Sequence, residues 1–387
     1  MILTILLLLI TAISILIVII LGVVIFLASP RFGRVPQGEI LARIQASPNY
    51  RDGRFHNLSP STIPIFGETS FSERIRGHLQ MLKRGKQISI SSMKTNLKEL
   101  NRNENVMVWM GHSSLFIQID GLRFLIDPVL VAGFSVPFFY RPFLGSEVYT
   151  PDDIPDIDYL LITHDHWDHL DHKAVTRLRD RTGKVICGLG VGEHFRRWKF
   201  NPENIIELDW NESVALKDII LHIFPAQHIS GRRSFGIDKT LWVSFMIEAP
   251  SLKIYISGDT GYGVHFSEIG KQFPTIDLAI IEFGYAEYAW RGIHIMPDNL
   301  AKAINDLKPK RSFTYHHAKY TQAGHRWKEP LEIVAKLIEQ EDLAIITPMI
   351  GELVFLNNLT QGFCKWWDDN DVDGLKSLNP EVSQPYP

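Results

Sequence analysis

The stretch Thr163-His-Asp-His-Trp-Asp-His-Leu-Asp171 decides the fold, because it places metal-binding side chains directly after a predicted buried strand. Three histidines and two aspartates fall within six consecutive positions of it. Imidazole and carboxylate groups are the ligands that zinc prefers where thiolates are absent. A loop that leaves a rigid strand can direct His164 and His166 to one metal ion, and Asp168 and His169 to a second. The alternative, a charged loop exposed to solvent, does not account for the H-x-H-x-D-H spacing.

Short β-type runs and helical segments occur on both sides of this stretch, which predicts an α/β domain. The predicted strands cover residues 106–110, 114–119, 123–126, 159–163, 184–187, 219–224, 241–247, 253–256 and 277–281. The predicted helices cover residues 173–181 and 298–307. Asp120-Gly121 is typical of a hairpin turn between two of the strands.

Three later segments also place metal-binding chemistry after predicted strands. They are Pro225-Ala-Gln-His228 after strand 219–224, Ser257-Gly-Asp-Thr-Gly261 after strand 253–256, and Thr314-Tyr-His-His317 after residues 311–313. An isolated histidine after a strand is more often a structural residue, so no single one of these segments identifies a site.

Together the four segments resemble the metallo-β-lactamase superfamily. In that family H-x-H-x-D-H stands at a strand end, and two further histidines and a bridging aspartate follow from later strand ends in this order. The resemblance implies an αββα sandwich, covers about Val106 to Glu352, and is closest to the N-acylphosphatidylethanolamine phospholipase D-like branch and its bacterial relatives. The stretches that carry it are Trp109–His112, Phe124–Pro128, His164–Asp171, Ile206–Trp210, Gly258–Tyr262, Glu268–Gly270 and Asp277–Ala279.

The resemblance also implies a dinuclear zinc site and its ligands. One zinc ion would be held by His164, His166 and His228, the other by Asp168, His169 and His316, and Asp259 would bridge them. The implied catalytic residues are Asp168, Asp259 and His294. His316 is preferred over His317 because Tyr315-His-His-Ala-Lys-Tyr320 aligns with the family pattern I-H-W-G-x-F. Iron or manganese could replace zinc in a site of nitrogen and oxygen ligands.

The resemblance further implies a hydrolase in which a hydroxide bound by both zinc ions attacks the substrate. It favours a phosphodiesterase that acts on an N-acylphosphatidylethanolamine-like phospholipid. One alternative is a lactonase similar to the ascorbate-phosphate lactonases, or a hydrolase of small phosphoesters or other esters. A second is a non-catalytic metal-binding scaffold in the membrane. The intact ligand set argues against the scaffold, since a scaffold needs no open dinuclear site.

One segment departs from the pattern of the lipid-cleaving members. Where they have a P-I-G-A-Y-E-P-like segment, this chain reads Glu282-Phe-Gly-Tyr-Ala-Glu-Tyr-Ala-Trp290. Because that segment should line the substrate pocket, its departure keeps the lactonase alternative open. The aromatic-rich stretch Phe134–Tyr140 could line an apolar channel for lipid, or could pack the edge of the sandwich.

The N-terminal segment Met1–Pro30 contains no Asp, Glu, Lys, Arg or His. About 20 apolar residues in a helix suffice to cross a bilayer, so the segment predicts a single-pass membrane anchor. The alternative is a cleaved signal peptide, but no Lys or Arg precedes the apolar run, which is also longer than the core of such a peptide. The first charges after it, Arg31, Arg34 and Arg43, favour a catalytic domain on the cytoplasmic side.

The rest of the chain divides into three predicted parts. Residues 31–105 form a linker and wrapping segment, 106–360 the hydrolase domain, and 361–387 an acidic tail predicted to be disordered. Within the linker, residues 71–100 are rich in Lys and Arg and could lie on anionic lipid or form a solvated face. The net charge of −3 gives no indication of nucleic-acid binding.

Three single residues are predicted to be structural. Cys187 lies in an apolar run and should be a buried thiol, since free cysteine is among the most buried residue types. His112 follows a strand and is interpreted as a turn residue, and His172 is expected to face solvent on the helix after the histidine motif.

Overall fold

The computed structural model describes residues 2–60, 88–131, 141–232, 236–284, 290–320 and 326–368. Four predicted features fall wholly or partly elsewhere. The aromatic stretch 134–140, the basic residues from Arg74 to Lys86, residues 285–289 of the departing segment and the tail from 369 lie outside the described residues.

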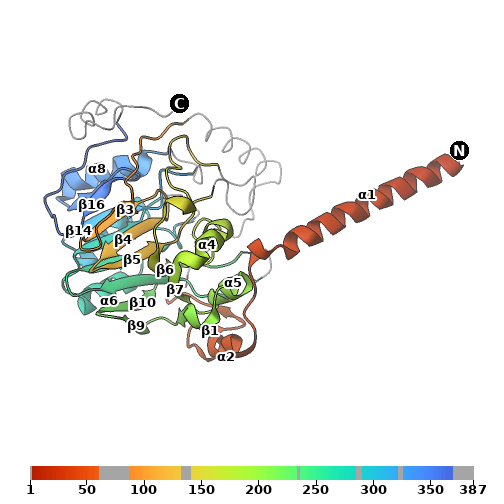
Figure 1. Cartoon of the computed structure of the whole chain (residues 1–387), viewed down its shortest axis with the longest axis horizontal. Coiled ribbons are helices and arrows are strands. Elements are labelled where there is room, and N and C mark those ends of the chain that lie inside the picture. The colour runs from red at the N-terminus through yellow and green to blue at the C-terminus, as the bar shows by residue number, and fades with distance from the viewer. Residues whose placement is uncertain are drawn as a thin grey trace.

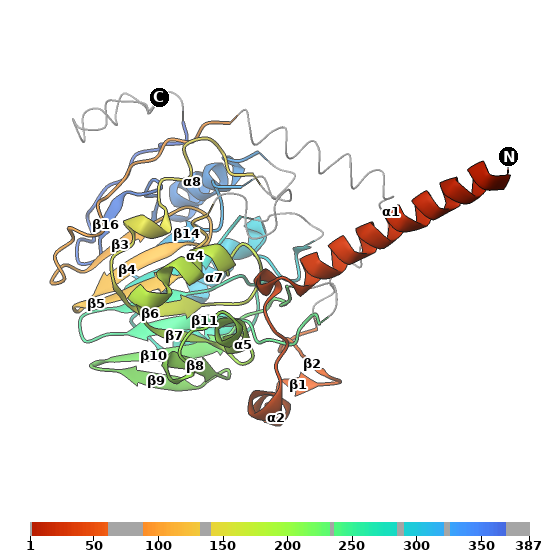
Figure 2. The ribbon, with the colours of Figure 1, turned by 45° about the vertical axis from the view of Figure 1, so that its right-hand side comes forward.

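Two seven-stranded sheets lie at the centre of the domain (Figures 1 and 2). In spatial order the first sheet contains β16 (Leu353–Phe355), β3 (Val106–Trp109), β4 (Leu115–Ile119), β5 (Leu122–Ile126), β6 (Ile157–Ile162), β7 (Thr182–Gly188) and β8 (Ile205–Leu208). The second contains β15 (Ile345–Ile346), β14 (Arg311–Tyr315), β13 (Leu278–Glu282), β12 (Lys253–Ile256), β11 (Val243–Glu248), β10 (Ile219–Pro225) and β9 (Ser213–Leu216).

The sheets are apolar on both faces, which explains why helices cover them from outside. In β4, Leu115 and Ile117 point into the core between the sheets, whereas Phe116 points into a second core on the opposite face. This is the side-chain alternation of a strand with both faces buried. In the second sheet, Ile280 faces the shared core and Ile281 faces outward into a third.

Helices α4 (His172–Leu178) and α5 (Gly192–Arg197) cover the outer face of the first sheet. Helices α6 (His265–Gln272), α7 (Pro297–Leu307) and α8 (Glu329–Glu341) cover that of the second. Short 3-10 turns occur at Pro151–Asp153, Arg179–Arg181 and Pro202–Asn204. The layers are helix, sheet, sheet and helix, so the predicted αββα sandwich is confirmed.

Strand direction brings the predicted site residues to one edge of the sandwich. Strands β5 to β8 run parallel, as do β12 to β15. The carboxyl ends of parallel strands meet at the same edge of a sheet, where ligand sites commonly form. The histidine motif follows β6, Asp259 follows β12 and His316 follows β14. These residues therefore lie at the same edge.

The N-terminal helix α1 (Ile2–Ala28) extends away from the domain in both views (Figures 1 and 2). By length and composition it can cross a membrane: it has 27 residues and no buried side chains, and an 18-residue window of it has a mean hydropathy of 3.3. A 3-10 turn (Pro30–Phe32), helix α2 (Gly38–Ala46) and the hairpin β1 (Tyr50–Arg51) and β2 (Arg54–Phe55) follow it.

Two sequence interpretations differ from the structure. Residues 31–105 were predicted to be a linker and wrapping segment, but α2 forms within them because Ile40 and Ile44, one helical turn apart, both pack against the main core. His172 was expected to face solvent, but it is half-buried, with its ring centroid 4.9 Å from that of Trp198. Cys187 is fully buried, as predicted.

Candidate metal centre

Five histidines and two aspartates gather at the edge of the sandwich where β6, β10, β12 and β14 end. The loop after β6 supplies His164, His166, Asp168 and His169, and the second sheet supplies His228, Asp259 and His316. All seven residues that the sequence analysis assigned as metal ligands thus come together. Both sheets contribute, so the cluster joins the two halves of the sandwich.

The first group consists of His164, His166 and His228, whose nearest ring nitrogens lie within 4.8 Å of one another. His166 Nδ1 lies 2.9 Å from His164 Nε2 and 3.2 Å from His228 Nε2. Three imidazole nitrogens that converge in this way offer a divalent cation three of its four usual ligands.

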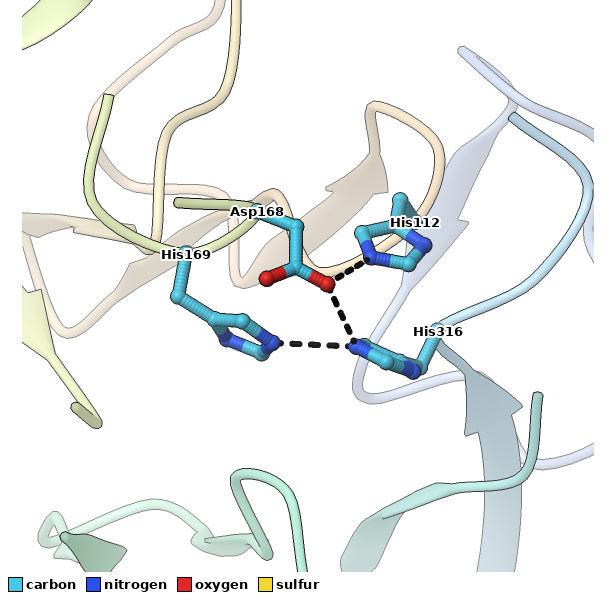
Figure 3. Close-up of side chains that lie close together, drawn as sticks. All are labelled: His112, Asp168, His169 and His316. Atoms are coloured by element: carbon cyan, nitrogen blue, oxygen red, sulfur yellow. Dashed lines mark hydrogen bonds and ion pairs between the residues drawn. The ribbon is translucent and has the colours of Figure 1, made fainter. Parts of the chain in front are cut away.

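The second group consists of Asp168, His169 and His316, joined by His112 (Figure 3). His316 Nε2 lies 3.0 Å from His169 Nε2 and 3.7 Å from Asp168 Oδ2. His317 points elsewhere: its Nε2 lies 3.1 Å from the Thr314 carbonyl oxygen, and its ring packs against Trp109. Of the two adjacent histidines, His316 therefore faces the cluster.

Asp259 lies between the two groups and offers one carboxylate oxygen to each. Its Oδ1 lies 3.1 Å from both His169 Nε2 and His316 Nε2. Its Oδ2 lies 3.6 Å from His228 Nε2 and 4.0 Å from His164 Nε2. This is the position that a carboxylate bridging two cations would take.

The second ring nitrogens of three of the histidines are held by acceptors from the protein. His169 Nδ1 lies 2.8 Å from Asp127 Oδ2, His228 Nδ1 lies 2.9 Å from the Ile293 carbonyl oxygen, and His164 Nδ1 lies 3.0 Å from Thr163 Oγ1. Such partners fix the tautomer and orientation of metal-binding histidines and raise their basicity. The cluster thus has the outer hydrogen bonds of a metal site.

Burial and mutual charge also favour cation binding. Burial, with the positive charge of neighbouring histidines, lowers the pKa of His164 well below its usual value, so its ring is held neutral. Burial alone would raise the pKa of Asp259, but His169, His316 and His228 hold it well below the usual range.

One buried oxygen provides a direct test of the fit to a metal ion. Asp259 Oδ1 is buried, and although His169 Nε2 and His316 Nε2 lie 3.1 Å from it, no hydrogen bond of good angular geometry reaches it from the described residues. A buried carboxylate oxygen without a donor is costly unless a cation meets it. The donor set and this oxygen together fit a pair of divalent cations.

Two residues of the site were not predicted as functional. His112 was interpreted as structural, but its Nε2 lies 3.1 Å from Asp168 Oδ2 and its ring centroid 3.9 Å from that of His316 (Figure 3). Asp127 accepts hydrogen bonds from the backbone N–H and the hydroxyl of Thr163, besides its contact with His169. In the sequence both residues follow predicted strands and lie in two of the stretches that carry the family resemblance, Trp109–His112 and Phe124–Pro128.

The backbone is strained at the same place. His112, Asp127 and His316 have φ angles of 51°, 42° and 73°, in the left-handed region that non-glycine residues rarely adopt. Such residues cost of order 1–3 kcal/mol each and cluster at functional sites, where the surrounding structure holds them. The strain is consistent with a preformed ligand cluster.

His294 lies beside the cluster, as the sequence analysis expected. Its Nδ1 is 3.3 Å from Glu282 Oε1, and its ring centroid is 5.1 Å from that of His228. Burial alone would lower the pKa of His294, but the Glu282 carboxylate raises it above the usual value. The site therefore contains a histidine whose protonated form is favoured by a neighbouring carboxylate, next to the predicted metal ligands.

Comparison with known proteins agrees with this geometry. A model of the beta-lactamase superfamily domain matches residues 122–317, which contain the whole cluster except His112. An uncharacterized protein of Mycobacterium tuberculosis is 31% identical over 327 residues, covering 81% of this chain and 86% of that protein. The chain belongs to the metallo-β-lactamase superfamily.

Other superfamily members extend the comparison. The chain is 28% identical over 269 residues to N-acyl-phosphatidylethanolamine-hydrolyzing phospholipase D 1 of Caenorhabditis elegans, which covers 63% of this chain and 74% of that one. The crystal structure of a possible metal-dependent hydrolase from Veillonella parvula shares the fold, with a TM-score of 0.54 and 16% identity over 65% of this chain and 99% of that one. Superfamily membership and the histidine–aspartate cluster identify the chain as a metal-dependent hydrolase.

Proposed function

We propose that this protein is a membrane-anchored phosphodiesterase with two zinc ions, acting on an N-acylphosphatidylethanolamine-like phospholipid. The observation that carries the proposal is the sequence similarity to the Caenorhabditis elegans phospholipase D, which covers 63% of this chain, taken together with the ligand cluster. The apolar helix α1 supports it, because an anchored enzyme meets its lipid substrate in the membrane.

The ligands divide between the two ions as their positions indicate. His164, His166 and His228 would hold the first, Asp168, His169 and His316 the second, and Asp259 would contact both. A pair of divalent cations supplies an activated water at neutral pH and neutralises the negative charge that develops on the phosphate. Iron or manganese could take the place of zinc in such a nitrogen- and oxygen-rich site.

His294 would supply the proton that the leaving group needs. The contact between its Nδ1 and Glu282 Oε1 orients the ring and favours its protonated form. A histidine in its protonated form can act as a general acid. Ile295 N also donates to Glu282 Oε1, at 2.7 Å, so this carboxylate is itself fixed in place. Because an activated water is the nucleophile, the reaction requires no serine or cysteine.

The test is hydrolysis of N-acylphosphatidylethanolamine in detergent micelles by the zinc-loaded full chain, with Asp259→Ala as the control. Release of phosphatidic acid by the wild type alone is the expected result. Absence of lipid cleavage by a preparation that contains two tightly bound metal ions would overturn the lipid assignment.

A lactonase or small-phosphoester hydrolase is the second candidate, favoured by the departure at residues 282–290 from the pattern of lipid-cleaving members. The same metal-loaded preparation would then cleave a soluble lactone or phosphoester but not the lipid. The ligand assignment is common to both candidates, so the Asp259→Ala variant should be inactive on either substrate.

A further inference from the structure

The segment from Ala28, the last residue of α1, to Pro36 is here called the connector. Hydrogen bonds hold it to the domain, although it adjoins the membrane helix. Trp198 Nε1 donates to the Pro30 carbonyl oxygen at 2.7 Å, and Arg197 donates to that of Ala28 at 2.7 Å. The backbone N–H of Arg34 lies 3.0 Å from His194 Nδ1. These contacts are made by residues about 160 positions later in the chain, so the connector is not a free tether.

The connector also packs on the loop that carries the predicted metal ligands. The buried ring of Phe32 meets the ring of Trp167 edge to face, with centroids 5.2 Å apart. The guanidinium group of the buried Arg232 lies over the ring of Trp167, 4.1 Å from its centroid. Trp167 stands between His166 and Asp168, so the base of the membrane helix adjoins the ligand loop.

Arg232 joins the connector to this loop by hydrogen bonds. Its Nε and Nη2 donate to the Arg31 carbonyl oxygen, at 3.1 and 3.0 Å. Its Nη1 donates to the carbonyl oxygens of Asp165 and Leu170, at 2.9 and 2.6 Å. One buried cation therefore holds the connector and both ends of the ligand loop in a fixed arrangement.

Basic side chains surround the place where α1 leaves the domain. This cationic face consists of Arg31, Arg34, Lys173 and Arg197. Their proximity is reflected in the pKa of His172, which burial and the charges of Arg232, Arg31, Lys173 and Arg197 lower to about 4. An ion pair with Glu193 at 3.7 Å partly offsets Arg34. Beside the face is an open hollow of about 440 Å³ lined by Arg34, Val35, Gln37 and Arg197.

We propose that the cationic face lies on anionic phospholipid headgroups and that the connector thereby holds the ligand loop at the membrane surface. The inference rests on the proposed membrane anchor, but it does not depend on which substrate the site cleaves. Basic residues next to a membrane helix are attracted to anionic lipid within about a Debye length. A lipid would then enter the site from the bilayer to which the enzyme is attached.

The glycine at position 33 provides a specific variant. Gly33 has φ = 65°, and a Cβ there would overlap the ring of His194. Gly38 has a similar φ of 58°, but a Cβ there meets nothing within 4 Å. Gly33→Ala should therefore displace the connector from His194, whereas Gly38→Ala adds comparable backbone strain without that overlap.

The experiment measures how close the cationic face is to lipid headgroups, in the full chain reconstituted in nanodiscs that contain phosphatidylglycerol. A fluorescent dye is attached at Lys173→Cys or, as control, at Lys336→Cys on α8, both in a Cys364→Ser background, and a quencher is carried on the headgroups. We expect at least threefold stronger quenching at position 173. We expect Gly33→Ala, but not Gly38→Ala, to reduce the quenching at position 173 at least twofold. Replacement of phosphatidylglycerol by phosphatidylcholine should reduce this quenching by at least the same factor.

Equal quenching at positions 173 and 336, or quenching that is unchanged by Gly33→Ala and by neutral lipid, would overturn the proposal. If Gly33→Ala does not fold, a ten-residue Gly-Ser insertion between Ala28 and Ser29 frees the connector from the anchor and should give the same loss. The readout needs no turnover. Strong quenching in a protein that cleaves no lipid would leave this inference standing and count against the proposed function alone.

Discussion

Asp127 shows how a residue that touches no predicted metal position can control the site. Its carboxylate meets His169 Nδ1 at 2.8 Å and accepts two hydrogen bonds from Thr163, the residue before the histidine motif. One buried side chain thus orients both the start of the ligand loop and a ligand near its end. Partners of this kind commonly change metal affinity without removing a ligand.

Replacement of Asp127 by asparagine should lower metal affinity about 10- to 100-fold, the range typical of such partners. The amide keeps the size of the side chain, but its single oxygen cannot accept all three hydrogen bonds that the two carboxylate oxygens accept from Thr163 and His169. Competition with a chromophoric chelator measures the affinity. Asp120→Asn, at an exposed turn, is the matched control and should bind metal as the wild type does. Wild-type affinity in Asp127→Asn would show that His169 needs no such partner.

The members of the histidine–aspartate cluster could be predicted at the residue scale because they follow strands in a recognisable order. The contact of His112 could not, because it joins residues 56 positions apart and depends on a left-handed backbone at His112. Neither feature leaves a periodic signal in the sequence. The same holds for Arg232, whose partners Arg31 and Asp165 are distant in sequence.

At the scale of elements, β12 and β6 approach each other closely where both lead into the site. Gly258, which precedes Asp259, has φ = 60°, and a Cβ there would lie 2.7 Å from the Val243 carbonyl oxygen and 3.0 Å from Thr163 Cβ. Real Cβ atoms do not approach other heavy atoms more closely than about 3 Å. Glycine at position 258 therefore allows the loop that carries Asp259 to pack directly against Thr163, at the start of the histidine loop.

Gly258→Ala should therefore destabilise the fold by about 1–3 kcal/mol through backbone strain, and more through the overlap. It should also weaken metal binding, because the loops must separate. Gly53→Ala is the matched control: its φ is 72°, but a Cβ would meet only the end of a lysine side chain, at 3.5 Å. Thermal unfolding of both variants in detergent measures the difference. Equal melting temperatures would contradict the close approach as the reason for glycine.

The strands that were predicted agree with the structure because apolar runs bounded by turns mark buried strands, whereas β8, β9, β15 and β16 were not predicted. Strand 253–256 matches β12, and the other predicted strands differ from the structure by a few residues at their ends. Helix α2 was missed because only Ile40 and Ile44 carry its apolar face, and two residues give little periodicity in a nine-residue helix. The connector was missed because its contacts are mainly to backbone carbonyls.

At the scale of the whole molecule, the ligand cluster links the two sheets at one edge. His164, His166, Asp168 and His169 follow a strand of the first sheet, and His228, Asp259 and His316 follow strands of the second. Bound cations would therefore cross-link the halves of the sandwich. A ligand at about 1,000 times its Kd stabilises the folded state by about 4 kcal/mol.

Removal of metal by a chelator should accordingly lower the melting temperature by about 10 °C, since about 1 kcal/mol shifts Tm by roughly 2–4 °C in a domain of this size. Zinc added in slight excess over the chelator should restore it. Asp259→Ala, which lacks the carboxylate between the two groups, should respond less to either treatment. A wild-type melting temperature that is indifferent to the chelator would show that the cluster does not hold the sheets together.

The interior of the molecule also contains a lysine that should make its stability depend on pH. Lys319 is 2% exposed, and its Nζ donates to the carbonyl oxygens of Val129, at 2.8 Å, and Met110, at 3.3 Å. Burial lowers the pKa of Lys319 to about 8, although Glu147 and Asp171 act in the opposite direction. Its value in the unfolded chain is about 10.4.

Between these two values the unfolded chain binds more protons at this lysine than the folded protein does, so folding becomes more favourable as pH rises. The wild type should therefore gain stability relative to Lys319→Met from pH 8 to pH 10.5, by about 2–3 kcal/mol at about 1.4 kcal/mol per pKa unit. Urea unfolding of both proteins across this range measures the difference. Lys336→Met, at an exposed position on α8, should keep a constant offset from the wild type. A constant offset for Lys319→Met as well would mean that its ammonium group is as well solvated in the folded protein as in the unfolded chain.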